Sequence, residues 1–513
     1  MTGLNPSVAH FLIHLGAMWC TWKESIVRVL SSLNWPVVGM LPGLLINATR
    51  IQEYVKDVLE ETGGTFFFKG PWFMGLNFVV TSDHENVNYI LSKNFMNYDK
   101  GPQFREIFEA LGDGIFNVDG DKWRLQRRMI HNLFKDTKFA MARNKATKKK
   151  IADGLLVVLD RASEMGEEVD AQELFRRLMF DSTCMILLDY DPHCLSIDLP
   201  KVEYEKAYCI MEEAALFRHI VPEWVWKLCR RLNIGEERIL RRAWDTFDEF
   251  LHSCISRKRE LLGREDSNSQ HVDLLSYFMG DVGADKVDQD KANFKEMREL
   301  GKTDKFLRDT CFNLVAAGRD TVSAAISWFL WVVATNPSVE EKIVQEMVER
   351  GGCAKGRIFE EELSELTYLH ACVNETLRLY PPLPLNHKAS SEADTLPSGM
   401  KVPANTKIIY SMYTMGRMES IWGEDCLEFK PERWISQKTG KIKHVPFHKF
   451  IAFNSGPRTC LGKHFALFQI MMVAAAAVWN YRFEVAEDCH VCPAASIVLH
   501  MKHGLKVRVS KRW

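Results

Sequence analysis

Apolar residues recur at the spacing of α-helices along most of this chain. Four segments combine an apolar face with a charged face in this way. They are residues 121–161, 171–189, 202–219 and 236–262. Residues 306–335 form a longer apolar stretch without proline, ended by Asn336-Pro337, which predicts a helix that crosses the whole molecule. Residues 464–479 are apolar on almost every face, as in a helix that is buried on most sides.

The remaining pattern predicts a small amount of β-structure. Residues 66–81 alternate short apolar runs with glycines and predict a strand pair, and residues 399–410 predict a turn followed by a short strand. Residues 363–380 form another helix, which Pro381-Pro382 ends. We therefore expect a mainly α-helical α+β fold with small β-sheets.

The N-terminal segment differs from the rest of the chain. Residues 8–22 are apolar apart from His10, His14 and Thr21, but the run is shorter than the ~20 residues that span a bilayer. Taken alone, the run predicts either an amphipathic surface helix or a short membrane anchor. Residues 34–43 follow with two prolines and two glycines, which make a stiff connection to the rest of the chain.

Composition and charge exclude several classes of protein. Lysine and arginine total 66 and aspartate and glutamate 67, so the net charge is −1. This balance argues against a protein that binds nucleic acid by neutralising its phosphates. The 13 cysteines are widely spread, which favours free thiols in a reducing compartment over a disulfide framework. Cys489 and Cys492 have CxxC spacing, but no second pair completes a zinc site, so we interpret the spacing as chance.

The strongest chemical signal is the segment FNSGPRTCLG at residues 453–462, directly before the apolar helix. A cysteine thiolate such as that of Cys460 is a strong ligand for haem iron and favours cleavage of the O–O bond. Gly456 and Gly462 let the backbone fold closely around a flat cofactor. Arg458 can pair with a haem propionate, and Phe453 can cover the sulfur.

This FxxGxRxCxG segment resembles the haem-binding signature of the cytochrome P-450 superfamily. Two further motifs stand in the order that the family requires. Glu375 and Arg378 form an ExxR motif 85 residues before Cys460 (460 − 375). The segment PERW, which contains Arg433, lies between this motif and Cys460. In the family, Glu375, Arg378 and Arg433 would form a structural cluster behind the haem. The resemblance covers about residues 35–513 and implies the cytochrome P-450 fold, with a long central helix over a haem held by a cysteine loop.

The long predicted helix carries AAGRDT at residues 316–321. Glycine inside a helix costs about 1 kcal/mol relative to alanine, so Gly318 needs a reason. The segment is similar to the oxygen-activation motif of the family. The resemblance implies that Ala316, Ala317 and Gly318 leave room for O₂ and substrate, that Thr321 hydrogen-bonds bound oxygen or an ordered water, and that Asp320 relays protons. Proton delivery is needed only for catalysis, which argues against a haem carrier or sensor.

Two further segments are expected near the haem propionates. Trp123 and Arg127 match the WxxxR helix of the family, and both would reach the propionates. His387 and Lys388 follow PPLP, where the family often has another propionate-binding residue, and the choice between them stays open. The exposed basic residues of the WxxxR helix form either a docking face for a reductase or an ordinary solvated face. They are Lys122, Arg124 and Arg128.

The resemblance also implies the cofactor, the partners and the location. We expect a haem b, O₂ as co-substrate, and electrons from NADPH through a separate NADPH–cytochrome P-450 reductase, because the chain has no flavin or nicotinamide motif of its own. Residues 1–33 would be a membrane anchor and residues 34–513 the haem-thiolate catalytic domain. The anchor would hold the protein on the endoplasmic reticulum membrane with the catalytic domain in the cytosol.

The substrate is expected to be hydrophobic or aromatic, because the segments that line the pocket in the family are almost wholly apolar here. Candidate lining residues are Phe104, Phe108, Phe116, Ala316, Ala317, Leu383, Leu385 and Ile497. Between them lie Arg105, Glu106, Glu109 and Asp113, which we expect to face solvent.

Within the superfamily, the chain resembles the plant group that contains midchain alkane hydroxylases and noroxomaritidine synthase. We favour intramolecular oxidative phenol coupling of 4′-O-methylnorbelladine to noroxomaritidine, a step of Amaryllidaceae alkaloid biosynthesis. Val322 departs from the pattern of fatty-chain relatives, phenylalanines could stack on aromatic rings, and Asn386 and His387 could hydrogen-bond a phenol. The alternative is midchain hydroxylation of long-chain alkanes or fatty chains in wax biosynthesis.

Overall fold

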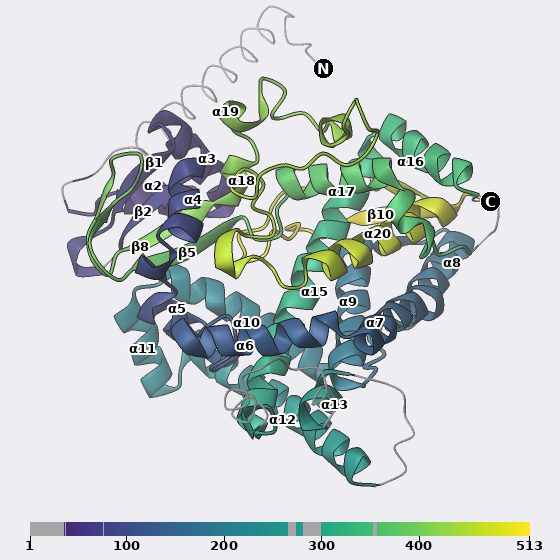
Figure 1. The fold of residues 1–513 in the computed structure, drawn as a ribbon, viewed down its shortest axis with the longest axis horizontal. Coiled ribbons are helices and arrows are strands. Elements are labelled where there is room, and N and C mark those ends of the chain that lie inside the picture. The colour runs from purple at the N-terminus through teal and green to yellow at the C-terminus, as the bar shows by residue number, and fades with distance from the viewer. Residues whose placement is uncertain (1–34, 36, 75, 265–272, 281–298, 352–355) are drawn as a thin grey trace, which may run out of the picture.

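The structure, a computed structural model, describes residues 35–513 except 36, 75, 265–272, 281–298 and 352–355 (Figure 1). The predicted anchor segment, residues 1–33, lies outside the described residues. Within the described part of the chain, no single helix is long and apolar enough to cross a membrane. A bent pair of the described helices, Asp304–Thr335 with Pro337–Glu349 at 106° to each other, passes the same test of length and composition.

The chain is mainly helical, as predicted. The helices of the described residues are α2 (Leu41–Ile46), α3 (Ile51–Glu61), α4 (His84–Asn88), α5 (Gly101–Ile107), α6 (Gly120–Lys135), α7 (Thr137–Lys150), α8 (Leu156–Met165), α9 (Ala171–Leu188), α10 (Glu203–Ile220), α11 (Glu223–Leu232), α12 (Gly235–Gly263), α13 (Leu274–Met279), α15 (Asp304–Thr335), α16 (Pro337–Glu349), α17 (Thr367–Leu379), α18 (Met412–Met415), α19 (Glu419–Trp422) and α20 (Lys463–Asn480). Short 3₁₀ turns include η9 (Pro431–Trp434) and η10 (Gly456–Arg458).

Three small sheets complete the fold. The largest has the order β1-β2-β8-β5-β3 and consists of β1 (Thr65–Lys69), β2 (Asn77–Thr81), β8 (Lys407–Ser411), β5 (Leu385–Ser390) and β3 (Tyr98–Asp99). The others are β4 (Glu168–Asp170), β10 (Lys506–Lys511) and β9 (Tyr481–Val485), and the pair β6 (Asp394–Thr395) and β7 (Lys401–Val402). The antiparallel pair β1–β2, with Phe67 opposite Val79, confirms the strand pair predicted at residues 66–81.

The long helix α15 lies in the centre of the molecule, and α9, α12, α17 and α20 pack against it (Figure 1). It is buried along most of its length because apolar residues cover nearly all of its faces, and it confirms the helix predicted at residues 306–335. The helical pattern at residues 121–161 is divided in the structure. Asp136 takes an extended backbone conformation and its carboxylate accepts from the Phe139 amide at 3.0 Å, so α6 ends and α7 begins there.

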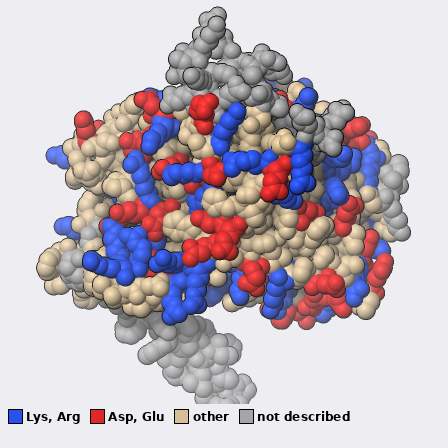
Figure 2. All heavy atoms as spheres, turned by 90° about the horizontal axis from the view of Figure 1, so that it is seen from below, with Lys and Arg blue, Asp and Glu red and all other residues tan. Residues whose placement is uncertain are grey.

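Charges on the surface are mixed in sign. Seen from below, groups of lysine and arginine alternate with groups of aspartate and glutamate (Figure 2). This distribution agrees with the net charge of −1.

A buried carboxylate connects α17 to the η9 turn. Glu375 is fully buried, and its oxygens accept from Arg378 Nε at 2.7 Å, Arg433 Nε at 2.9 Å and Trp434 Nε1 at 2.8 Å. The three charged groups predicted as a structural cluster therefore meet. A buried charge is tolerated only when it is paired and hydrogen-bonded, and here every side of the carboxylate has a donor.

Arg378 extends the same cluster to the backbone. Its guanidinium donates to the carbonyl oxygens of Gly416, Cys426 and Glu428, which lie on the chain between β8 and η9. A Cβ atom at Gly416 would lie 2.0 Å from the Arg378 carbonyl oxygen, so only glycine permits this approach. The ion cluster thus holds α17 and residues 416–434 in one arrangement.

We expect Glu375→Ala and Arg378→Ala each to lower the free energy of unfolding by ~3–5 kcal/mol, because each leaves an unpaired buried charge. Urea unfolding measures this change. Glu432→Ala is the matched control, since Glu432 pairs with Lys342 on the surface and its loss should cost less than about 1 kcal/mol. Equal stability of the Glu375 and Glu432 variants would contradict the structural role of the cluster.

Candidate active site

Cys460 lies in a loop between η10 and the start of α20. Its backbone N–H donates to the Phe453 carbonyl at 2.9 Å, which closes the loop. Gly456 has φ of 65°, and a Cβ there would lie 1.9 Å from the Leu91 carbonyl oxygen. Glycine is therefore required at this turn, as the sequence predicted.

The environment of the Cys460 sulfur has two opposing effects on its pKa. Cys460 is an exposed residue, but the protein atoms around the sulfur still raise the pKa of its thiol. The Gly462 amide donates to the sulfur, and the positive charges of Arg127 and Lys463 also favour the thiolate. The loop thus presents a cysteine whose anionic form has one amide donor and two cations nearby.

Arg127, Arg458 and Trp123 meet beside this loop. Arg127 donates to the Thr459 carbonyl at 2.7 Å, and Arg458 lies over the Trp123 ring at 4.6 Å. Arg458 also donates to Asp119 and to the Val118 carbonyl, each at 2.7 Å. The four residues predicted at the cofactor edge from these two segments, Trp123, Arg127, Arg458 and Cys460, are therefore close together.

Lys388 and His387 point in opposite directions from β5, because neighbouring residues of a strand alternate between its faces. Lys388 donates to the Tyr98 carbonyl at 2.9 Å, and burial, with the nearby charge of Arg458, lowers its pKa to about 7. His387 instead contacts His219 of α10, with 3.3 Å between their Nε2 atoms. Of the two alternatives, Lys388 is the one that lies in the charged cluster of Arg458.

Asp320 is a residue of α15 and is buried in a polar network. Its carboxylate accepts from Tyr208 Oη at 2.6 Å and from Arg319 at 2.7 Å. Burial and the Asp320 charge raise the pKa of Tyr208. The phenol therefore stays protonated and donates a hydrogen bond to the carboxylate. Arg319 also pairs with Glu205. Asp320 is thus a buried carboxylate, not part of an exposed charged face.

The neighbouring positions on α15 differ in their exposure. Ala316, Ala317 and Thr321 are partly exposed, and the Thr321 hydroxyl donates to the Ala317 carbonyl at 2.7 Å. Gly318 has a packing role that the sequence did not indicate. A Cβ at this position would lie 3.0 Å from Thr183 Oγ1 of α9, so the glycine allows two helices to pack closely.

The segment between α5 and α6 joins α15 to the cysteine loop. Asn313 of α15 accepts from the Phe116 amide at 3.0 Å, and Asp309 accepts from the Asp113 amide at 2.9 Å. The same segment accepts from Arg458 through Val118 and Asp119. Sequence reasoning missed these connecting residues; the glycines at 112 and 114, which pack against Asp309 and Asn313, are the signal that could have indicated a close approach.

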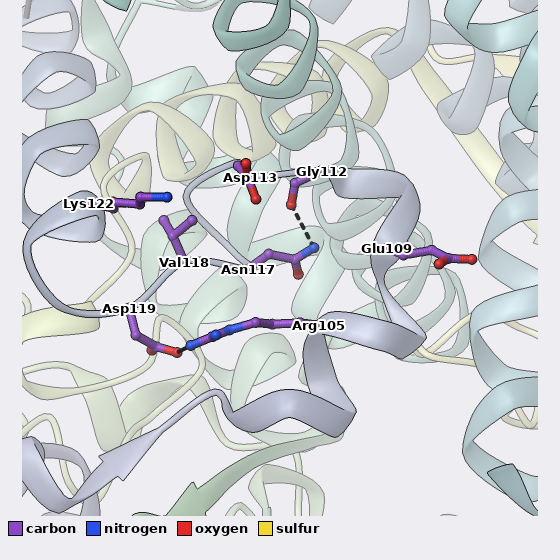
Figure 3. A pocket seen from close by; sticks show the side chains of 8 residues that line it. All are labelled: Arg105, Glu109, Gly112, Asp113, Asn117, Val118, Asp119 and Lys122. Atoms are coloured by element: carbon purple, nitrogen blue, oxygen red, sulfur yellow. Dashed lines mark hydrogen bonds and ion pairs between the residues drawn. The ribbon is translucent and has the colours of Figure 1, made fainter.

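The predicted lining residues are only partly brought together. Phe104 is buried and lies 4.6 Å from the Phe108 ring, and Phe108 lies 5.5 Å from His219. Phe116, Leu383, Leu385 and Ile497 are partly buried. The polar side chains of the same loop line an outer pocket of about 470 Å³ with Asp119 and Lys122, and Arg105 pairs there with Asp119 at 2.8 Å (Figure 3). Arg105 and Asp113 are exposed and Glu106 and Glu109 partly so, which agrees with the expected solvent-facing side.

These features define a haem-thiolate oxidoreductase: a cysteine loop with a satisfied sulfur, a cationic cluster beside it, and a buried acid on the central helix. The comparison with known families agrees, because the cytochrome P450 model matches residues 30–506. The chain belongs to the cytochrome P450 family, whose members use haem iron with electrons from NADPH supplied by a reductase.

Several plant proteins are similar to the chain over nearly its whole length. Alkane hydroxylase MAH1 of Arabidopsis thaliana is 44% identical over 93% of this chain and 93% of its own. Cytochrome P450 86B1 of the same plant is 39% identical over 93% of this chain and 85% of its own. Noroxomaritidine synthase of Narcissus aff. pseudonarcissus MK-2014 is 38% identical over 93% of this chain and 91% of its own.

The donor set around Cys460 fits a haem. The sulfur has the amide donor that a thiolate ligand needs, and Arg127, Arg458 and Lys388 supply cations for two carboxylates. When bound, the haem supplies the iron that activates O₂ for oxidation of substrate.

We expect Cys460→Ser to abolish the thiolate-type absorption band of the reduced protein with carbon monoxide, and turnover with it. A serine hydroxyl is not ionised at neutral pH and cannot replace the thiolate. Absorption difference spectra measure the change. Cys489→Ser, at a partly exposed cysteine outside the loop of residues 453–462, is the control and should keep both the band and the activity. A serine variant at 460 with an unchanged spectrum would contradict the assignment.

Proposed function

We propose that Cys460 is the axial ligand of the haem iron, with Phe453 beside it and Gly456 and Gly462 shaping its loop. Arg127, Arg458, Trp123 and Lys388 hold the propionates, since their cationic and indole N–H groups cluster on one side of that loop. His387 is left out of this set because its imidazole contacts His219 instead.

Asp320 and Thr321 deliver protons to the site of oxygen reduction. Hydrogen bonds from Tyr208 and Arg319 fix the position of the Asp320 carboxylate. Thr321, the next residue, is partly exposed, and its hydroxyl donates to the Ala317 carbonyl. A positioned hydroxyl and a buried acid in sequence are the parts that proton transfer requires.

We expect Thr321→Ala to keep haem binding but to lower severalfold the ratio of product formed to NADPH oxidised, with hydrogen peroxide released instead. The hydroxyl that directs protons is then missing. Thr335→Ala is a close control, because the Thr335 hydroxyl also donates to the carbonyl four residues earlier, at 2.8 Å, but lies at the far end of α15. Unchanged coupling in Thr321→Ala would count against its role.

The reaction we propose is hydroxylation of a C–H bond in a long aliphatic chain. The observation that carries this proposal is the 44% identity with alkane hydroxylase MAH1, against 38% with noroxomaritidine synthase over a similar share of the chain. The methyl side chains of Ala316 and Ala317 on the open side of α15 suit a chain without polar groups.

Phenol coupling of 4′-O-methylnorbelladine remains the second candidate, favoured by the similarity to the Narcissus enzymes. Two of the observations that favoured an aromatic substrate are weaker in this structure. The Nε2 atom of His387 lies 3.3 Å from His219, so it is engaged already, and Phe104 is buried against Phe108. The departure at Val322 stands, but Val322 is a buried core residue of α15 and does not line an open face.

Turnover under ¹⁸O₂ with the reductase separates the two reactions. We expect a long alkane or fatty acid to give an alcohol that contains ¹⁸O, because one atom of O₂ enters the product. 4′-O-methylnorbelladine should remain unchanged, and the Cys460→Ser variant serves as the inactive control. A coupled dienone without ¹⁸O, together with unreacted chain substrates, would contradict hydroxylation in favour of coupling.

For the location we rely on the resemblance to family members that an N-terminal helix and a proline-rich hinge anchor to the endoplasmic reticulum. The apolar run at residues 8–22 and the proline-rich connection support a segment, residues 1–33, that anchors the protein to the endoplasmic reticulum membrane with residues 34–513 in the cytosol. The reductase would dock on the basic side of α6 and α7, where Lys122, Arg128, Lys135 and Lys138 are exposed. Arg124 contributes less, since it pairs with Asp121 at 2.7 Å.

A further inference from the structure

One face of the largest sheet gathers basic side chains. In the antiparallel pair β5–β8, Lys407 is opposite Ala389 and His387 is opposite Ile409. Residues opposite each other point to the same face, so Lys407 and His387 share a face as diagonal neighbours. Gly101 at the start of α5 approaches Ala389 so closely that a Cβ there would lie 2.7 Å from the alanine methyl. Lys100, one residue earlier, therefore lies at the same face.

His219 near the end of α10 completes the group. Its Nδ1 lies 2.7 Å from the Ala215 carbonyl, which can only accept, so Nδ1 carries the proton and Nε2 carries the lone pair. His387 then donates from its Nε2 to that lone pair across 3.3 Å. Burial and nearby lysines lower the pKa of both imidazoles, that of His219 to about 4, so both rings are neutral at neutral pH.

The two lysines have no acidic partner at this face. Within the described residues, no carboxylate forms an ion pair with the ammonium group of Lys100 or Lys407. Lys100 lies over the Phe104 ring at 3.9 Å and Lys407 over the Phe78 ring at 5.1 Å. Burial lowers the pKa of Lys407 to about 8. Burial and the charges of Lys388 and Arg458 lower the pKa of Lys100, and the charge of Asp119 opposes this. Both lysines are partly buried, and because cations held partly out of water without a counter-ion are costly, an anion that enters would stabilise them.

Apolar rings adjoin this basic group. Phe104 lies 5.0 Å from the His387 ring, and Phe108 lies 5.5 Å from the His219 ring. A ligand that satisfies both surfaces must carry a negative charge at one end and an apolar body beyond it. Lys388 on the other face of β5 lies with Arg458 in the cluster assigned to the propionates. Lys100 lies near enough to both for their charges to lower its pKa, so the basic group adjoins that cluster.

We propose that Lys100, Lys407, His219 and His387 form an anion subsite that binds the terminal carboxylate of a long-chain substrate. This inference rests on the proposed hydroxylation of an aliphatic chain and specifies its substrate as a fatty acid or another carboxylate-terminated chain. The carboxylate pairs with the lysine ammonium groups and replaces His219 Nε2 as the acceptor of the His387 N–H. Such an anchor also fixes how far along the chain oxidation occurs.

Ligand-induced spectral shifts of the haem-loaded protein test the subsite. The ligands are hexadecanoate, hexadecanol and methyl hexadecanoate, which share a chain and differ in charge. We expect wild type to bind hexadecanoate most tightly, and Lys407→Met to weaken that binding about tenfold or more while leaving hexadecanol within about twofold. Lys401→Met, on the exposed strand β7, is the matched control and should change neither. His387→Phe, which removes the imidazole donor but keeps a ring, should act in the same direction as Lys407→Met.

The position of the hydroxyl group in the product gives a second measurement. Loss of the anchor in Lys407→Met should broaden the distribution of hydroxylated positions from hexadecanoate, which a change in folding alone would not do. Equal binding of hexadecanoate and hexadecanol by wild type, or equal weakening of all three ligands in Lys407→Met, would overturn the subsite while leaving chain hydroxylation intact. If wild type neither binds nor oxidises any of the three chains, the subsite and the proposed function are both wrong.

Discussion

The carboxylate of Glu375 is the interaction on which the arrangement of this protein depends. A fully buried charge is unfavourable unless several donors satisfy it, and Arg378, Arg433 and Trp434 do so from two separate segments. The cluster thereby holds α17 against residues 416–434. Because α17 also packs on α15 and α20, the helix that carries the acid and the helix that follows Cys460 are oriented by the same support.

The helices that the Glu375 cluster supports carry groups of opposite charge. Cations collect beside the cysteine loop, where Arg127 and the Gly462 amide favour a thiolate. The negative charge of Asp320 on α15 is compensated by Arg319. On β5, two neighbouring residues face different clusters, with Lys388 beside Arg458 and His387 beside His219. One strand thus separates the residues assigned to the cofactor from those that we assign to the substrate.

Sequence alone predicted the parts of this account that depend on local pattern or on ordered motifs. The periodicity of residues 306–335 predicted α15, and the ExxR and PERW motifs predicted that Glu375 meets Arg378 and Arg433. Contacts between distant segments could not be predicted, because their register is set by packing that leaves no pattern in one chain. The bond from Tyr208 to Asp320 and the His219–His387 pair are of this kind. Gly318 was interpreted from its motif, whereas its neighbour Thr183 lies 135 residues earlier (318 − 183) and explains it.

Cys460 in the loop at residues 453–462 is the proposed thiolate ligand of the haem iron, and the Glu375 cluster supports the helices around that loop. Electron paramagnetic resonance of the ferric haem-loaded protein tests this ligation most directly, because the spectrum reports the axial ligand. The account predicts the narrow-spread low-spin signal of a thiolate-ligated haem, and its loss when Glu375 is replaced by alanine. The signal of a histidine-ligated haem in the wild-type protein would contradict the account.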